Sequence, residues 1–326
     1  MLYSKEWAIL ISIPNILTFF KDGTMISNSR TLLASVSMLT FLILMLTSDS
    51  SSQDSISSKS VNNKSTVHLL PNYYIYGTVG TFLFHKSETF KKNYLMETDL
   101  NFGLDFISFL DNFHSVWDIN VKVGVGKQFE NVVFDPRWLT IAIVPSLEYR
   151  FNSLITQIAL DRRCFHEVDH EPARQTVYWT LPFVLVGSPN MRQPVYEDNI
   201  FSKDQLTIKD RLSWYGKTGW FIDHFFNYPS DLTGGGHDYK FMLNFGARYT
   251  FVKINRWAAW IAHKTNFYTD KNSECYFTED IELNNTFHGE NFNITLFLNY
   301  TFFDNKHEYK NMNRDQLGEL GLMFTF

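Results

Sequence analysis

The most constraining feature of this sequence is a series of long segments in which apolar and polar residues alternate at period two. In the first clear example the two sets are Leu100, Phe102, Leu104 and Phe106 against Asp99, Asn101, Gly103 and Asp105. The same alternation recurs in the segments 117–126, 139–151, 239–251 and 292–302. Successive side chains of a β-strand point to opposite faces, so each segment is predicted to be a strand with one apolar and one polar face. No helical period is sustained beyond Pro71. We therefore predict an all-β fold.

The length of these segments separates two kinds of β-fold. Strands of soluble proteins usually run to about five or six residues, whereas a strand that crosses a bilayer needs about 9–11. The alternating segments reach the longer range, and aromatic residues often stand at the ends of their apolar faces, as with Trp117, Tyr149 and Phe251. Aromatic girdles of this kind mark the two membrane interfaces of a transmembrane barrel. The fold predicted is a closed antiparallel transmembrane β-barrel, with a secreted soluble β-fold as the alternative.

The end of the chain carries the most specific motif. It reads Glu319-Leu-Gly321-Leu-Met-Phe324-Thr-Phe326, in which a polar residue and a glycine precede alternating apolar residues and a terminal phenylalanine. This motif resembles the terminal recognition signal of bacterial outer-membrane β-barrel proteins. The resemblance covers eight residues and implies that Glu319, Gly321, Phe324 and Phe326 form an assembly signal read by the barrel-assembly machinery. It implies a location in the bacterial outer membrane.

The N-terminal part of the chain has the composition of a targeting segment. An uncharged, mostly apolar stretch from Thr31 to Leu46 follows Arg30 and precedes a polar run, which predicts a secretory signal peptide over 25–50. A true N-terminal membrane anchor is the alternative. Residues 1–24 are then interpreted as an extension ahead of a start at Met25. The Ser-rich stretch 51–68 has too few apolar residues to bury a core and is predicted to be a disordered tether, so the barrel occupies 69–326.

The alternation predicts twelve strands, with ten or fourteen as alternatives. Their expected ranges are 73–85, 96–109, 116–126, 138–151, 154–165, 175–186, 206–222, 239–252, 256–268, 275–287, 291–303 and 316–326. An even number is expected of a bacterial barrel. Short connections alternate with long ones, including outer loops predicted at 127–137, 223–238 and 304–315. The connection 187–205 is too long for a periplasmic turn, so we expect either a missed strand pair or a segment folded into the barrel.

Composition excludes several other classes of protein. The 326 residues carry 29 Lys and Arg against 34 Asp and Glu, which removes the electrostatic basis for nucleic-acid binding. Two cysteines exclude a disulfide-built scaffold or a four-Cys zinc module. A mean hydropathy of −0.18 is too polar for a bundle of transmembrane helices.

Charges on the predicted inner face are sorted by strand. The three strands within 206–268 contribute only bases, and the strands from 275 round to 109 contribute only acids. The basic set is Arg211, Lys217, Lys240, Arg248 and Lys264, and the acidic set is Asp280, Glu282, Glu319, Asp99 and Asp105. Two interpretations remain open: a transverse field across a narrow pore, or opposite charges that pair and fill a small barrel.

One dense polar cluster, Asp161–Glu171, lies at the predicted outer end of a strand and in the loop after it. Within it His166, Asp169 and His170 are weak candidates for a catalytic site, since histidine beside a carboxylate is able to act as a base. Barrel lipases and lipid A deacylases place their sites on the barrel wall near the outer leaflet, which a site near His166 would resemble. Their His-x-Ser pattern, however, does not occur in the body of this chain. We expect no metal and no cofactor.

The function predicted is therefore a non-enzymatic outer-membrane barrel, porin-like in that it transports small polar solutes through a narrow channel, or a structural barrel. The alternative is an outer-membrane lipid-modifying hydrolase with a site near His166. Expected partners are the lipids and lipopolysaccharide of a Gram-negative outer membrane and the barrel-assembly machinery, which would act through the C-terminal strand. No nucleic-acid partner is expected.

Overall fold

The computed structural model describes residues 67–85, 94–110, 112–126, 135–151, 153–167, 176–227, 239–305 and 314–326. All of them belong to the second of the two units into which the chain divides, Asn63–Phe326. The segments predicted as an N-terminal extension (1–24) and a signal peptide (25–50), and nearly all of the tether, lie outside the described residues.

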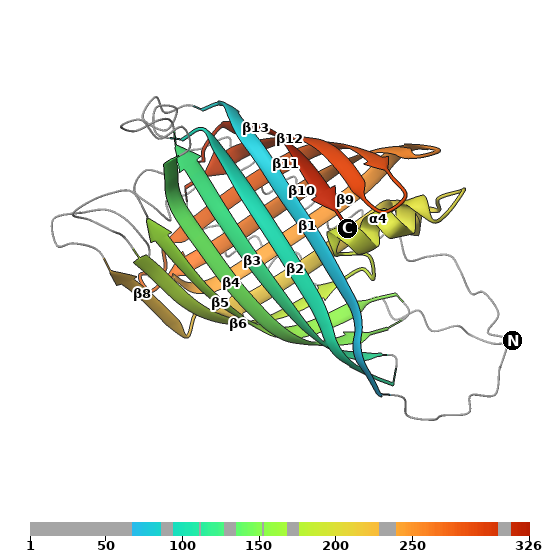
Figure 1. Ribbon diagram of the computed structural model, residues 1–326. Coiled ribbons are helices and arrows are strands. Elements are labelled where there is room, and N and C mark those ends of the chain that lie inside the picture. Colours follow the sequence, from blue (N-terminus) through green and yellow to red (C-terminus); the bar gives the residue numbers. More distant parts are fainter. Residues whose placement is uncertain are drawn as a thin grey trace, which may run out of the picture. The chain divides into compact units, whose positions relative to one another are not determined.

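The described residues form thirteen strands and two helices in chain order (Figure 1). The elements are β1 Val67–Phe84, β2 Met96–Phe109, β3 Phe113–Gly126, β4 Asp135–Arg150, β5 Ile155–Glu167, β6 Thr176–Gly187, α4 Gln193–Phe201, α5 Ile208–Arg211, β7 Leu212–Trp220, β8 Asp223–Asn227, β9 Tyr239–Ile254, β10 Trp257–Asp270, β11 Cys275–His288, β12 Asn293–Asp304 and β13 Leu317–Thr325.

Twelve of these strands close into a ring of antiparallel neighbours. The order runs from β1 through β7 and from β9 to β13, and the ring closes where β13 pairs with β1, from Tyr76 opposite Thr325 to Phe84 opposite Gly318. The thirteenth strand, β8, pairs only with the first residues of β6, beyond the point where β7 ends. The prediction of a closed antiparallel barrel of twelve strands is confirmed.

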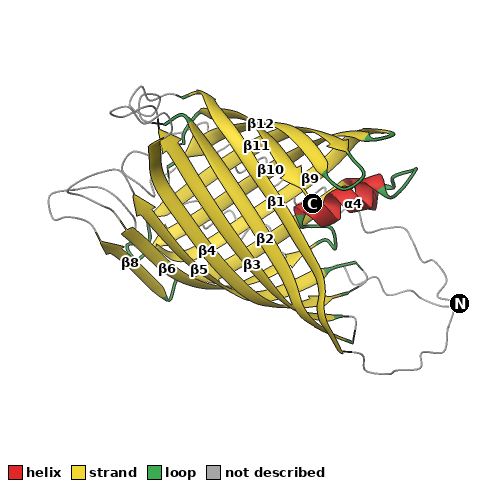
Figure 2. Ribbon diagram, in the orientation of Figure 1, coloured by secondary structure: helices red, strands yellow, loops and turns green. Residues whose placement is uncertain are grey.

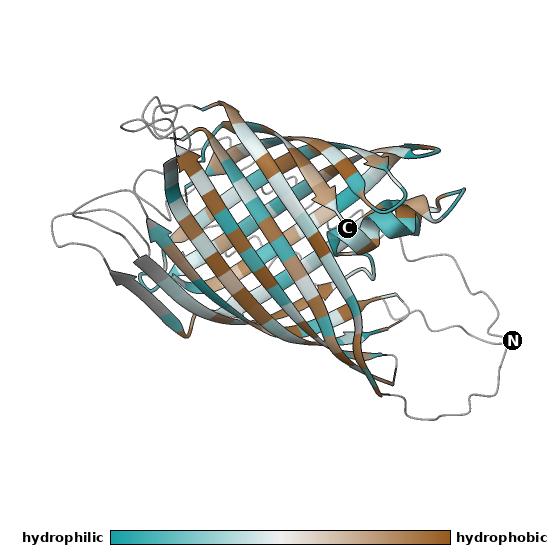
Figure 3. Cartoon of the chain, viewed as in Figure 1, coloured by the Kyte–Doolittle hydropathy of each residue, from teal (hydrophilic) through white to brown (hydrophobic). Residues whose placement is uncertain are grey.

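Side chains alternate between the inside and the outside of this ring as the sequence predicts. Exposed apolar residues such as Leu100, Leu147 and Leu296 lie on the outer face, while the intervening residues of the same strands are buried or half-buried inside. Figure 3 shows the resulting checkered pattern along the front strands. Strands of 14 and 16 residues, such as β3 and β4, exceed the length required to cross a bilayer. Neither helix in the described part of the chain is long and apolar enough to span a membrane.

Most predicted strand ranges agree with the structure to within a few residues; two strand ranges and one loop differ more. Strand β1 begins at Val67, inside the range assigned to the tether. The strand predicted over 206–222 begins only at Leu212, because 208–211 form the short helix α5. Part of the loop predicted at 223–238 is the strand β8, and the rest of that loop lies outside the described residues.

The long connection after β6 is a segment folded into the barrel, one of the two explanations that the sequence left open. It contains α4, which lies at the end of the barrel where the chain terminates (Figure 2). We call residues 188–207 the inturned segment, the end of the barrel next to Phe326 the near mouth, and the opposite end the far mouth.

Candidate functional site: the lumen and its inturned segment

The inturned segment is held in place by its own local structure. Ser188 and Asn190 bond to the first residues of β7, where the Trp214 amide donates to Ser188 Oγ at 2.9 Å and Ser213 Oγ donates to the Asn190 carbonyl at 2.9 Å. Pro194 lies in the first turn of α4, a position that suits its fixed φ and its missing N–H. At the other end Thr207 and Asp210 form a capping box that begins α5. The segment thus leaves β6 and enters β7 through defined turns.

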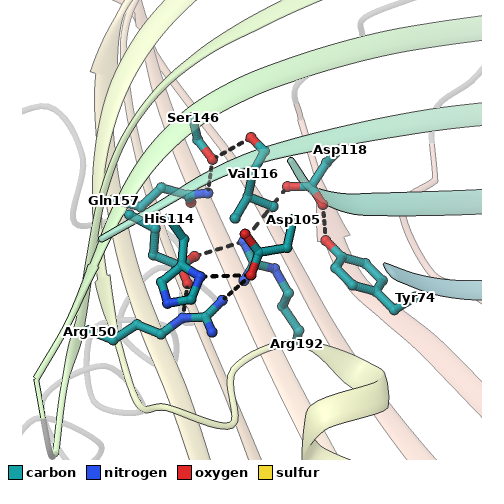
Figure 4. Close-up of polar contacts among 10 residues, drawn as sticks. Tyr74, Asp105, His114, Val116, Asp118, Ser146, Arg150, Gln157 and Arg192 are labelled. Carbon is teal, nitrogen blue, oxygen red and sulfur yellow. Dashed lines mark hydrogen bonds and ion pairs between the residues drawn. The ribbon is translucent and has the colours of Figure 1, made fainter. Parts of the chain in front are cut away.

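Arg192 ties the start of this segment to one wall of the lumen. Its guanidinium forms an ion pair with Glu148 on β4 at 2.8 Å and lies 4.0 Å from Asp118 on β3 (Figure 4). The Glu148 side chain is completely buried and is also bonded to Arg150 at 2.6 Å. Asp118 accepts a hydrogen bond from the hydroxyl of Tyr74, and the Tyr74 ring lies 5.5 Å from the Arg192 guanidinium. A buried carboxylate thus gains a second cation from the inturned segment.

Tyr74 lies against the wall because its neighbour on β2 is a glycine. Gly103 pairs with Tyr74, and a Cβ built at Gly103 would overlap the Tyr74 ring. Only a residue without a side chain leaves room for the ring to lie flat across the strand.

Tyr196 and Glu197 tie the helix α4 to other strands. Tyr196 is fully buried, with its hydroxyl 2.7 Å from Thr250 Oγ1 on β9 and its ring edge-on to Trp260 on β10, at 5.7 Å between centroids. Glu197 is also fully buried and accepts hydrogen bonds from Gln193 at 2.7 Å and from Asn293 on β12 at 2.8 Å. Burial raises the pKa of the Glu197 carboxyl above its ordinary value, and these hydrogen bonds offset that effect only in part.

These two sets of contacts lie on opposite sides of the ring. Counting round the twelve strands, the boundary between β3 and β4 is six positions from the boundary between β10 and β11. Arg192 contacts the first pair, whereas Tyr196 and Glu197 contact β9, β10 and β12. The inturned segment therefore crosses the lumen at the near mouth.

On one wall of the lumen, charges of opposite sign form ion pairs. These pairs lie mainly on β2 to β7 and hold most of the mixed charges of that wall. They are His114 with Asp105 (2.7 Å), Arg150 with Asp105 (3.7 Å), Arg163 with Asp161 (3.0 Å), Lys217 with Asp161 (3.9 Å), Lys122 with Glu97 (2.6 Å) and Arg314 with Glu97. Of the predicted lumen charges, Lys217 and Asp105 thus lie in ion pairs.

The other predicted lumen charges remain separated. Lys264 is exposed although it points into the barrel, and it forms no ion pair with the described residues. The Arg248 guanidinium lies over the rings of Tyr196 and Trp260, at 5.5 and 5.9 Å from their centroids. Asp99, Asp280 and Glu282 accept hydrogen bonds from neutral side chains. Glu319 contacts Gly80. None of these four acids forms an ion pair with the described residues. Opposite charges therefore pair on one wall of the lumen, whereas the charges of the other wall form no ion pair among the described residues.

Two of the predicted basic lumen residues lie elsewhere. Arg211 is the last residue of α5, and its guanidinium donates to the carbonyl of Thr250 at 3.0 Å at the near mouth. Lys240 is exposed at a register irregularity of β9, where Tyr239 and Phe241 pair with the consecutive residues Asp270 and Thr269. Helix α5 and this irregularity interrupt the strict alternation. A period of two therefore assigned both residues wrongly to the inner face.

Toward the far mouth the inner face is aromatic. A buried cluster lines this end of the lumen, with Tyr239 5.1 Å from Tyr268 and Trp138 5.8 Å from Phe165 between ring centroids. Its members are Tyr94, Trp138, Phe165, Trp179, Leu181, Tyr239, Met242, Tyr268, Tyr276 and Leu317. From the far mouth to the near mouth, the lumen thus contains an aromatic layer, then a charged layer, and then the inturned segment.

The polar cluster at Asp161–Glu171 does not form a site among the described residues. His166 lies half-buried on the outer face of β5, with its ring edge-on to Tyr178 at 5.8 Å, whereas Asp161 and Arg163 point inward. Asp169 and His170 lie outside the described residues. Cys164 and Cys275 are both free thiols. Within the described ranges, three or more His, Cys, Asp and Glu side chains do not gather as they would to hold a metal ion.

The C-terminal motif occupies the strand that closes the ring. Gly321 packs against Gly80 of β1 and the ring of Phe297, so a Cβ would meet them at 2.7 and 2.4 Å. Glu319 points inward, while Phe326 is exposed on the outer face and exchanges backbone hydrogen bonds with Ile75. The motif thus lies at the seam between the last strand and the first.

Arg192, Tyr196 and Glu197 were not among the sequence candidates. The signal available for them was the length of the connection 187–205, the proline at a helix start, and the apolar pair Tyr196 and Ile200 four residues apart. These features predict a short helix, but they do not identify the strands that it contacts.

The closed ring with an apolar outer face and a polar interior is that of an outer-membrane β-barrel. No protein-family model and no curated protein matches the chain. Among solved structures it is similar to KdgM porin, with 10% identity, coverage of 78% of this chain and 99% of that chain, and a TM-score of 0.40. It is similar to outer membrane phospholipase A from Escherichia coli, with 11% identity, coverage of 79% of this chain and 98% of that chain, and a TM-score of 0.43. It is also similar to NanC porin, with 9% identity, coverage of 78% of this chain and 99% of that chain, and a TM-score of 0.39. Similarities of this size identify neither a solute nor an activity.

Proposed function

We propose that this protein is a bacterial outer-membrane channel that passes small polar solutes and is kept narrow by its inturned segment. The observation that carries the proposal is the path of residues 188–207 across the near mouth, tied to opposite walls by Arg192 on one side and by Tyr196 and Glu197 on the other. A barrel of twelve strands has a wider interior than its wall side chains need, and this segment takes up part of that space.

The polar layer between the inturned segment and the aromatic cluster supports transport of polar solutes. Lys264 points into the lumen and is exposed, so the barrel interior has room for water around its ammonium group. Basic side chains of β9 and β10 face a ring interior whose remaining wall carries Asp99, Asp280 and Glu282. Fixed charges in a pore of small diameter select solutes by charge as well as size.

The direct test is a single-channel recording of the purified full-length protein in planar bilayers. We expect small, resolvable conductance steps from the wild-type barrel. If neither the wild type nor a variant with a released inturned segment conducts, the channel is contradicted and a purely structural barrel is favoured.

Reversing one lumen charge is expected to change ion selectivity without affecting folding. Lys264→Glu replaces an exposed cation that forms no ion pair with the described residues, so the ratio of cation to anion permeability should rise several-fold because the local potential changes sign. Lys271→Glu, in the exposed turn between β10 and β11, is the matched control and should leave the ratio near the wild-type value. Reversal potentials under a salt gradient measure both. Equal shifts in the two variants would contradict a charge-selective lumen at Lys264.

The conductance is expected to fall as the pH is lowered, through Glu197. A carboxyl whose pKa is raised by burial binds its proton more tightly in the docked segment than in a released one, so docking is strengthened below that pKa and weakened above it. Recordings from about pH 5 to about pH 8 should show this trend in the wild type. Glu197→Gln should remove it, because the amide is neutral throughout.

The same comparison separates Glu197 from the other ionisable groups nearby. Arg248 faces Glu197 from β9, while His288 of β11 contacts Asn293 at 2.6 Å and stacks on Phe201. A pH dependence that persists in Glu197→Gln would contradict the role of Glu197.

The hydrolase alternative gains no support from the described residues, because His166 lies on the outer face of β5 with its ring against Tyr178, while Asp169 and His170 lie outside the described residues. Lipid turnover by the purified wild type that His166→Ala abolishes would reinstate it.

Export and assembly complete the proposal. The segment 25–50 is assigned to secretion, the terminal motif at Glu319, Gly321, Phe324 and Phe326 to the barrel-assembly machinery, and the outer apolar wall to outer-membrane lipids, including lipopolysaccharide. Fractionation of cells expressing the full chain tests this location: heat-modifiable protein in the outer-membrane fraction supports it, and protein without a heat shift in another fraction contradicts it.

A further inference from the structure

The outer face of β10 and β11 carries two ionisable side chains in the middle of an apolar wall. On β10 the inward residues include Trp260 and Asn266, which bond to Thr286 and Thr278 of β11 inside the barrel at 2.8 and 2.6 Å. His263 has the opposite parity and therefore points outward. Glu279 has the opposite parity to Thr278 and likewise points outward.

These two side chains contact each other. His263 Nε2 lies 3.0 Å from Glu279 Oε1, and Thr265 Oγ1, on the same face, lies 3.5 Å from the same nitrogen. Both ionisable side chains are only partly exposed, at 27% for His263 and 16% for Glu279. The three residues form one polar patch, which we call the outer polar patch.

The surroundings of this patch are those of a membrane-facing wall. His263 pairs with Ala247 on β9 and Ile281 on β11, and Thr265 pairs with Phe245 and with Glu279 itself. Next toward the far mouth the rings of Phe267 and Phe277 lie 4.9 Å apart on the same face. The patch therefore lies inside the apolar band rather than at its rim.

Ionisable groups on a lipid-facing surface are costly unless their polar atoms are satisfied. Within the patch one atom of each group is used: His263 Nε2 and Glu279 Oε1. His263 Nδ1 and Glu279 Oε2 have no hydrogen-bond partner among the described residues. The patch thus offers one further imidazole nitrogen and one further carboxylate oxygen to a partner that comes from the membrane side.

We propose that the outer polar patch is the contact between two copies of this chain side by side in the membrane. A two-fold axis along the membrane normal brings patches of equal depth together, so that His263 of each copy meets Glu279 of the other. A patch that holds both a donor and an acceptor is self-complementary under such an axis. The small side chain of Ala247 beside His263 allows the two walls to approach closely, and polar contacts of this kind hold transmembrane segments together.

We assign the contact to a second copy because the patch holds both a hydrogen-bond donor and an acceptor, His263 and Glu279. A lipid headgroup that presents phosphate would be attracted by His263 but repelled by Glu279. The proposal is independent of the channel function, since the patch lies on the outer face and the lumen residues on the inner face.

Cysteine cross-linking in membranes tests the contact. In a full-length background with Cys164→Ser and Cys275→Ser, Ile281→Cys places one thiol next to His263 on the outer face, and Leu147→Cys places a matched thiol on the outer face of β4, across the ring. Oxidation should give a disulfide-linked dimer of Ile281→Cys and at least tenfold less of Leu147→Cys. Equal yields from the two positions would overturn the proposal.

Two further variants test whether the polar groups of the patch are required for the contact. His263→Leu with Glu279→Leu removes both polar groups; the heat-modifiable barrel should persist, because apolar residues suit this wall, while the Ile281→Cys cross-link falls at least tenfold. The exchange His263→Glu with Glu279→His keeps one donor and one acceptor and should restore the cross-link. A cross-link unchanged in the double leucine variant overturns the contact. The contact is also overturned if Ile281→Cys gives no cross-link and the protein binds lipid phosphate that the double leucine variant loses, since the patch would then bind lipid.

Discussion

Replacing Arg192 with alanine is expected to raise the single-channel conductance several-fold. Arg192 is the residue of the inturned segment that reaches the β3–β4 wall, and Glu148 opposite it is completely buried. Removing one partner of a buried ion pair costs about 3–5 kcal/mol, because the other charge is left without compensation. Arg150 remains beside Glu148 at 2.6 Å and moderates that cost. The weakened contact lets this end of the segment leave the lumen.

The expected change is a wider passage in a barrel that still folds. The twelve-stranded ring does not depend on Arg192 for any backbone hydrogen bond between strands, so the heat-modifiable species should persist on gels. Arg256→Ala is the matched control: its guanidinium lies 4.0 Å from Glu290 in an exposed pair, with exposed fractions of 60% and 82%. Such pairs contribute little, and its conductance should equal that of the wild type. An unchanged conductance in Arg192→Ala, with the barrel intact, would contradict the role of this segment as the constriction.

Deleting residues 324–326 is expected to remove most of the folded barrel from the outer membrane, by tenfold or more. Phe324 and Thr325 pair with Gly77 and Tyr76, and Phe326 exchanges two backbone hydrogen bonds with Ile75. Without these residues the edge of β1 is left open in the lipid, where each unsatisfied backbone group costs several kcal/mol. Loss of the terminal phenylalanine would also remove the assembly signal that we propose.

Two single substitutions separate these causes. Phe326→Ala keeps the backbone hydrogen bonds and removes only the ring, whereas Phe292→Ala removes a neighbouring exposed ring, 6.4 Å away, that lies outside the motif. If the machinery reads the terminal ring, Phe326→Ala should lower the yield of heat-modifiable barrel and Phe292→Ala should not. If the deletion variant gives as much heat-modifiable barrel as the wild type, both the need for the last β13–β1 pairs and the proposed assembly signal are contradicted.

Much of the barrel was predictable because the period of a β-strand is a local property. Alternation of Leu100 and Phe102 with Asp99 and Asn101 is visible in a few consecutive residues, and burial on one side then determines the face to which each residue belongs. For this reason twelve strands, their approximate ranges, and the inward position of Lys264 and Glu282 followed from the sequence. The outward parity of His263 and Glu279 was available too, but their contact was not, since it joins two strands in register.

The tertiary structure alone decided where the inturned segment lies and which charges pair. The connection 187–205 was visibly too long, yet its helix owes its position to Glu148, Thr250 and Asn293, which lie far from it in the chain and meet it only when the ring closes. Lys240 was misplaced because an irregularity in β9 shifts the alternation locally. Sequence by itself therefore determined the wall of this barrel, since a strand's two faces are set by neighbouring residues. The contents of the barrel depended on contacts across the lumen, which no local pattern records.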